Sequence, residues 1–216
     1  MRRIAIYALT PQGAFLGRRI ADDLDGDLYL TKRLSDSHKG RPFDRLMDIV
    51  AKHFSAYEGH IFIAATGIVV RAIAPLLKSK DMDPAVVVLD QDGQHVISLL
   101  SGHLGGANEM AQRVARSIGG QAVITTATDS AGLPSFDLLA KARGMTIANL
   151  NGVRHVNMAL LTGEPVQIFD REDRLGLGRG GAVEFSIQWR ETESAWVDGC
   201  PGVWVTWRSQ VPDKRL

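Results

Sequence analysis

The stretch IFIAATGIVVRAIAP, residues 61–75, decides the fold class. Its first five residues form an apolar run of strand length, typical of a strand that is buried on both faces of a parallel sheet. Thr66 and Gly67 then open a short helix. This helix carries Arg71 and ends near Pro75, because proline cannot continue a helix. The stretch therefore predicts a buried strand followed at once by a helix, which is the repeating unit of an α/β fold.

Strands and helices alternate on both sides of this stretch. Further strands are predicted at 3–9, 28–30, 86–89, 95–100 and 122–125, and helices at 13–22, 43–54 and 104–118. Residues 31–42 are polar, and we interpret them as a mobile loop. The alternation predicts an α/β fold with a largely parallel sheet flanked by helices.

The pattern changes near residue 130, where we predict a domain boundary. Residues 1–130 are expected to form an N-terminal α/β domain, and residues 131–216 a smaller α/β or α+β domain. In this second domain we predict helices at 135–144 and 151–161, and strands at 145–147, 166–169, 182–189 and 203–207.

Composition excludes several classes of protein. The formal net charge of the 216 residues is +1, which argues against a nucleic-acid binder because no large basic field attracts phosphates. Cys200 is the single cysteine, so no internal disulfide forms, and a cytoplasmic location is expected. No apolar run approaches the roughly 20 residues that span a membrane. The six histidines show no metal-ligand spacing, so no metal held by the protein is expected.

The segment SGHLGGANE, residues 101–109, directly precedes an amphipathic helix. Glycines allow close approach of a ligand to the backbone, and the first turn of a helix favours an anion. His103 adds a group that exchanges a proton near neutral pH. The segment predicts a site for an acidic ligand with proton-transfer chemistry, although glycines packed at a helix entry explain it about as well.

Two other segments, residues 66–71 and residues 125–129, also follow predicted strands of the same sheet. In open α/β sheets, ligands bind outside the carboxyl ends of the strands, and an arginine there can form a forked pair with a carboxylate. A capping role explains the threonines near residue 125 about as well. The candidate binding residues are Thr66, Gly67, Arg71, Ser101, Gly102, Gly105, Gly106, Asn108, Thr125, Thr126 and Asp129, and the candidate catalytic residues are His103 and Glu109.

Read together, these segments resemble the CbiG family of anaerobic cobalamin biosynthesis, the cobalt-precorrin-5A hydrolases. The resemblance lies in TGIVVRAIAPLL at 66–77, DPAVVV at 83–88, residues 101–109 and VITTATD at 123–129. It is specific over about residues 62–129 and looser elsewhere, and residues 130–170 are similar to the central region of that family.

The resemblance implies a substrate and a reaction. Family members open the δ-lactone of cobalt-precorrin-5A and release acetaldehyde, giving cobalt-precorrin-5B. The substrate is a tetrapyrrole that carries cobalt and many carboxylates, so the cobalt enters with the substrate and no cofactor is expected to be held by the protein. For this reaction we expect His103 to act as general base, the N–H groups around Gly105 and Gly106 to hold the oxyanion, and Glu109 to share in proton transfer.

Longer family members continue into a C-terminal domain, and the resemblance leads us to expect that this domain is absent here. A separately encoded partner protein of that type is therefore expected as one possibility, and homo-oligomerisation stays open. Neither nucleic acid nor a membrane is an expected partner. Two alternative hypotheses about function stay open. The chain is a tetrapyrrole-binding or carrier module without catalysis, or it binds a phosphate or nucleotide through residues 102–106.

Overall fold

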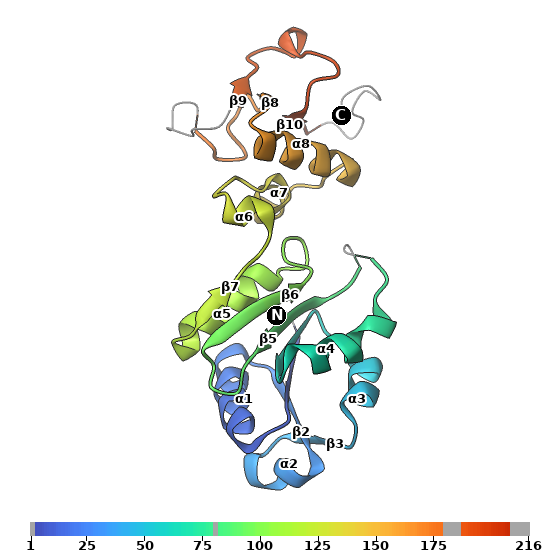
Figure 1. Ribbon diagram of the computed structural model, residues 1–216. Helices are drawn as coiled ribbons and strands as arrows, with labels where there is room; N and C mark the ends of the chain where they lie inside the picture. Colours follow the sequence, from blue (N-terminus) through green and yellow to red (C-terminus); the bar gives the residue numbers. More distant parts are fainter. Residues whose placement is uncertain (1–2, 80–81, 179–186, 208–216) are drawn as a thin grey trace. The chain divides into compact units, whose positions relative to one another are not determined.

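The computed structural model describes residues 3–79, 82–178 and 187–207, which fall into two compact units (Figure 1). The first unit ends at Thr125 and the second begins at Thr126. Each unit is described by itself below. Within the described ranges, no helix is both long enough and apolar enough to cross a membrane.

The first unit is a seven-stranded sheet with helices on both faces, which confirms the predicted fold class. The strand order is β3-β2-β1-β4-β5-β6-β7, and every neighbouring pair is parallel except β5 and β6. The strands are β1 (Ile4–Ala8), β2 (Asp27–Thr31), β3 (Arg41–Phe43), β4 (Gly59–Ile63), β5 (Ala85–Leu89), β6 (His95–Leu100) and β7 (Gln121–Val123). The helices are α1 (Pro11–Leu24), α2 (Lys32–His38), α3 (Leu46–His53), α4 (Thr66–Ile73) and α5 (Ala107–Ile118), with a 3₁₀ turn at Ala74–Leu76.

Two apolar layers cover the two faces of this sheet. Ile61 and Ile63 of β4 belong to the layer that contains α1 and α5, whereas Phe62 belongs to the layer that contains α3 and α4. Figure 1 shows these two pairs of helices on opposite sides of the strands. All five residues of β4 are buried, and residues 61–63 begin the apolar run that predicts a strand covered on both faces.

The polar segment 31–42 is not the loop that we expected. Lys32–His38 form α2 and Arg41–Phe43 form β3, so the prediction of a mobile loop is wrong. Leu34 is buried in the core, and the guanidinium of Arg18 donates to the carbonyl oxygens of His38 and Lys39 at the end of α2. Tertiary contacts of this kind stabilise a short helix that its own composition does not predict.

The second unit contains three helices and a three-stranded parallel sheet in the order β10-β8-β9 within the described residues. Its elements are α6 (Ala127–Ser130), α7 (Phe136–Ala142), α8 (Leu150–Thr162), β8 (Val166–Phe169), β9 (Ile187–Trp189), a 3₁₀ turn at Glu193–Ala195 and β10 (Gly202–Trp204). The predicted strand at 145–147 does not form. Of the strand predicted at 182–189, residues 182–186 lie outside the described residues.

The buried side chain of Gln167 holds this unit together. Its amide nitrogen donates to the carbonyl oxygens of Val197 and Cys200, at 2.7 and 3.1 Å. Its amide oxygen accepts from the backbone N–H of Val197 and from the Nε of Arg190, both at 3.1 Å. One glutamine of β8 therefore fixes the irregular segment between β9 and β10, because each of its polar atoms is satisfied.

Candidate functional site

The direction of β6 decides which predicted site residues lie together. Val86 near the start of β5 pairs with Leu100 at the end of β6, because the two strands are antiparallel. The segment after β6 therefore emerges beside the first residues of β1, β4 and β5, an edge of the sheet that we call the amino edge. The segment after β4 emerges at the opposite edge, the carboxyl edge. The expectation that these segments share one edge is wrong.

The candidate residues accordingly fall into three groups. At the amino edge lie Ser101, Gly102, His103, Gly105, Gly106, Asn108, Glu109 and, after the parallel strand β7, Thr125. At the carboxyl edge lie Thr66, Gly67 and Arg71, and in the second unit lie Thr126 and Asp129. A signal for this division was present in the sequence: residues 90–94 are too short a connection for a parallel crossover, which needs a dozen residues or more.

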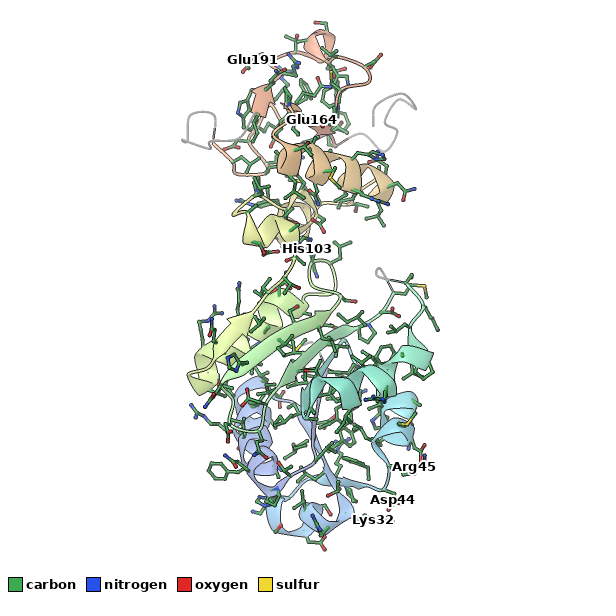
Figure 2. All side chains as sticks on the ribbon, viewed as in Figure 1. Lys32, Asp44, Arg45, His103, Glu164 and Glu191 are labelled. Carbon is green, nitrogen blue, oxygen red and sulfur yellow. The ribbon has the colours of Figure 1, made fainter. Side chains whose placement is uncertain are left out.

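The loop between β6 and α5 is fixed by its own backbone. The N–H of Gly106 donates to the carbonyl of His103 at 2.9 Å, and the N–H of Ala107 donates to the carbonyl of Ser101 at 3.1 Å. The hydroxyl of Ser101 donates to the carbonyl of Asp83 at 2.9 Å, which ties the loop to the segment before β5. Figure 2 shows His103 on this loop, where it is half-buried. The loop therefore presents a histidine from a rigid turn.

The start of α5 is anchored to β6 by a buried amide. The hydroxyl of Ser98 donates to the side-chain oxygen of Asn108 at 2.6 Å, and the N–H of Asn108 donates to the carbonyl of Gly102 at 3.0 Å. Asn108 is buried, so this pair positions the first turn of α5 rather than an exposed ligand. Its predicted role in substrate binding stays a prediction.

The hydrogen bonds of the loop reduce the number of N–H groups that are available to bind the oxyanion, which we expected to be held around Gly105 and Gly106. The N–H of Gly106 is already bonded to His103, and the N–H groups of Ala107 and Asn108 are bonded to the loop carbonyls. Within the described part of the chain, the N–H of Gly105 has no such partner. Gly105 is therefore the residue of this pair whose N–H has no backbone acceptor among the described residues, and we expect this N–H to bind the oxyanion.

Gly105 also has no room for a side chain. A Cβ atom there would lie 2.3 Å from the Cβ of Ser101 and 2.6 Å from the Ser101 carbonyl oxygen. We expect Gly105→Ala to displace the loop and to lower the free energy of unfolding by about 1–3 kcal/mol, as overpacking does. Urea unfolding and amide hydrogen exchange at Ala107 and Asn108 measure the two effects.

The matched control lies at the other end of the same helix. Gly119 has a φ of +80° and open space where a Cβ would stand. Gly119→Ala is expected to lower stability through the left-handed backbone alone, by about 1–2 kcal/mol, and to leave exchange at Ala107 and Asn108 unchanged. Wild-type exchange and stability in Gly105→Ala would contradict the crowding argument.

A pocket of about 350 Å³ opens at the amino ends of β1 and β4. It is lined by Ile4, Leu24, Asp25, Glu58, Gly59, Gly106, Glu109, Met110 and Arg113. Three of these residues are acidic and one is basic, so the pocket suits a neutral or cationic group better than a carboxylate. Its carboxylates can exchange protons with a bound molecule. Sequence reasoning selected Glu109 here and missed Glu58, which only the pairing of β1 with β4 brings to the pocket.

The three residues of the carboxyl edge are arranged differently. Thr66 is the first residue of α4 and is half-buried. Arg71 is exposed, and its guanidinium donates to the carbonyl of Gly67 at 3.0 Å, so it folds back toward the start of its own helix. Their predicted role in binding stays a prediction.

Thr126 and Asp129 form a local pair in the second unit. The hydroxyl of Thr126 donates to the carboxylate of Asp129 across the first turn of α6. Thr126 stands at the N-cap position of α6, but its side chain makes no capping bond to the helix backbone, so this contact does not establish the capping role that the sequence left open as an alternative. No group of three or more histidine, cysteine or acidic side chains suited to a metal ion occurs among the described residues.

Comparison with known families identifies this architecture. Residues 48–129 match the family model for the cobalamin synthesis G N-terminal region, and residues 134–215 match the model for the cobalamin biosynthesis central region. The chain belongs to the CbiG family. All candidate residues predicted from the sequence fall within the N-terminal CbiG region, and the two family matches confirm the resemblance drawn from the sequence.

Curated relatives of this CbiG chain carry one name. The cobalt-precorrin-5A hydrolase of Salmonella typhimurium is 42% identical over 168 residues, which is 77% of this chain and 48% of the relative. The protein of the same name from Priestia megaterium is 34% identical over 170 residues, or 76% and 46% of the two chains. This chain therefore spans about half the length of the curated relatives that it matches.

A solved structure shares the fold. The cobalamin biosynthesis protein G homolog from Sulfolobus solfataricus superposes with a TM-score of 0.51 and 24% identity. The match covers 94% of this chain and 60% of that chain. At this identity the likeness supports the fold alone.

Proposed function

We propose that this CbiG chain hydrolyses the δ-lactone of cobalt-precorrin-5A and releases acetaldehyde, giving cobalt-precorrin-5B. The observation that carries the proposal is the 42% identity over 168 residues to a protein named cobalt-precorrin-5A hydrolase. The geometry supports it, since one rigid loop presents His103 at the amino edge and the helix that follows places Glu109 in a pocket.

In the proposed reaction His103 removes a proton from water, and the water oxygen adds to the lactone carbonyl carbon. The N–H of Gly105 donates to the oxyanion, a contribution of about 3 kcal/mol per donor in known enzymes. The ring C–O bond then breaks, which leaves a carboxylate and an alkoxide. The alkoxide becomes the aldehyde of acetaldehyde as the adjacent C–C bond breaks, and the electron pair stays on the macrocycle carbon, where Glu109 or His103 supplies a proton.

The substrate brings its own cobalt in this proposal, and the protein holds no cofactor. Arg71, Thr66 and Gly67 are kept as candidate contacts to peripheral groups of a large substrate, although they lie at the other edge of the sheet. A separately encoded partner that resembles the C-terminal domain of longer CbiG proteins is proposed as an aid to turnover. The cytoplasm is the proposed location.

The test is acetaldehyde release from cobalt-precorrin-5A by the purified chain. We expect one acetaldehyde for each substrate converted, detected by coupled oxidation of the aldehyde. If the substrate binds but no acetaldehyde appears, even with a C-terminal-type partner protein added, the chain is a tetrapyrrole-binding module and the proposal is wrong.

A further inference from the structure

Two arginines meet one carboxylate at the amino ends of neighbouring strands. Asp27 is the first residue of β2, and its Oδ1 lies 2.7 Å from the Nη2 of Arg41, the first residue of β3. Its Oδ2 lies 3.8 Å from the Nη2 of Arg3, directly before β1. One carboxylate therefore orients two guanidinium groups that are 67% and 60% exposed.

Two tyrosines support the same guanidinium groups. The Cζ of Arg3 lies 4.8 Å from the ring centre of Tyr57, and the Cζ of Arg41 lies 5.8 Å from that of Tyr29. Contacts of this kind hold a cation over the face of an aromatic ring. The Nη1 of Arg41 also donates to the hydroxyl of Tyr29 at 3.4 Å.

The two hydroxyls complete a closed ring of hydrogen bonds. Tyr57 donates to Asp27, so its oxygen accepts from the hydroxyl of Tyr29 at 2.7 Å. Burial raises the pKa of Tyr57, and its bond to Asp27 acts in the same direction, so the hydroxyl stays protonated as a donor. Arg41, Tyr29, Tyr57 and Asp27 thereby fix one another before any ligand arrives.

Positive charge exceeds negative charge around His53, and the acidic pocket with Asp25 and Glu58 adjoins the ring on another side. Three cations, Arg3, Arg41 and Lys52, act on His53 at the end of α3, against the single carboxylate of Asp27. Burial and these cations lower the pKa of His53, which therefore adds no further positive charge at neutral pH. The excess charge is local, since the whole chain has a formal net charge of only +1.

We propose that this arginine–tyrosine patch, formed by Arg3, Asp27, Tyr29, Arg41 and Tyr57, binds a ligand that carries two or more carboxylates. A guanidinium presents parallel N–H donors that match a carboxylate, and the fixed geometry lowers the entropy lost on binding. The proposal does not rest on the proposed hydrolase activity.

The patch adjoins the acidic pocket along the amino edge. Arg3 precedes Ile4, and Tyr57 precedes Glu58 and Gly59, and these three neighbours line the pocket. A polycarboxylate at the patch is therefore either part of a large molecule that also enters the pocket, or a separate small acid. Both sources have the same chemistry, and a competition experiment separates them.

The probe is tricarballylate, titrated calorimetrically into the whole chain at low ionic strength. We expect saturable binding that weakens with added salt. Arg3→Gln and Arg41→Gln are each expected to weaken it about tenfold, and Arg41→Lys to weaken it less, because lysine keeps the charge but loses the fork. The control is Arg45→Gln, an exposed arginine beside Lys32 and Asp44 at the carboxyl edge (Figure 2), which should bind as wild type does.

A second readout follows His53 by NMR. Bound tricarballylate offsets the cations that lower the pKa of His53, so this pKa should rise on saturation and should rise less in Arg41→Gln. Wild-type affinity in both glutamine variants, or the same loss in Arg45→Gln, would overturn the proposal. If cobalt-precorrin-5A displaces tricarballylate, the carboxylates belong to that molecule; if both bind together, the patch serves a second ligand.

Discussion

Replacement of His103 by alanine is expected to reduce acetaldehyde release about 10²–10⁴-fold, the usual contribution of a general base. The loop should keep its shape, because three of its bonds use groups other than the imidazole: Gly106 N–H to the carbonyl of residue 103, Ala107 N–H to the carbonyl of Ser101, and the Ser101 hydroxyl to the carbonyl of Asp83. An alanine retains all of these groups. The loss should therefore appear in turnover with little change in substrate affinity or in the urea unfolding midpoint.

Two controls separate a catalytic role for His103 from a structural one. His95 is an exposed histidine at the other end of β6, beside Asp90, and His95→Ala should turn over substrate at the wild-type rate. Added imidazole should restore part of the activity of His103→Ala, since a diffusible base can occupy the space left by the ring. Full turnover in His103→Ala, with normal folding, would remove this residue from the mechanism.

Local sequence patterns predicted the elements that bury a continuous apolar surface. The run at 61–65 contains the last three residues of β4 and the two residues after it, and the helix expected after the run is α4. Such segments are predictable because one sequence-local property, the apolar period, decides both their structure and their burial. α2 was missed because its stability comes from Arg18 and the core beside Leu34, which its own sequence does not reveal.

The candidate site was predictable only in part. The glycine–histidine loop was recognised because its residues are contiguous, and the structure brings them together at the start of α5. The edge of the sheet on which this loop lies depends on the antiparallel pairing of β5 with β6. The motifs alone did not indicate this pairing. Glu58 and the arginine–tyrosine patch escaped notice because their members come from the starts of different strands, and only the strand order makes them neighbours.

His60 is a buried histidine whose hydrogen bonds fix its protonation state. Burial raises the pKa of Tyr7, so its hydroxyl keeps its proton and donates to the Nδ1 of His60 across 3.3 Å. The Nε2 of His60 lies 3.1 Å from the carbonyl oxygen of Phe54 and must carry the hydrogen of that bond. The ring stacks with Phe54, Phe62 and Tyr7. A second proton on Nδ1 would break the bond from Tyr7 and place a charge in an apolar layer.

Acid is therefore expected to destabilise the first unit through His60. Burial lowers the pKa of His60 from 6.5 to about 4, so between these pH values the unfolded chain binds a proton that the folded chain excludes. The contribution of His60 to the free energy of unfolding is fully present above pH 6.5 and is lost as the pH decreases toward 4. The difference between the two pKa values corresponds to about 3 kcal/mol in the free energy of unfolding. His60→Gln, whose amide can accept from Tyr7 and donate to Phe54, should lose this part of the pH dependence.

The distribution of aromatic residues allows the two units to be followed separately. All three tyrosines lie in the first unit, and all four tryptophans lie between residues 189 and 207 of the second. We expect urea unfolding followed by tyrosine signals to give, for the wild type, a free energy of unfolding that rises with pH between 4 and 7. In His60→Gln this pH dependence should be weaker. The tryptophan transition should be the same in both proteins, since His60 does not belong to that unit. Equal tyrosine slopes in the two proteins would mean that His60 is protonated in the folded state, and the tautomer inferred from Tyr7 and Phe54 would then be wrong.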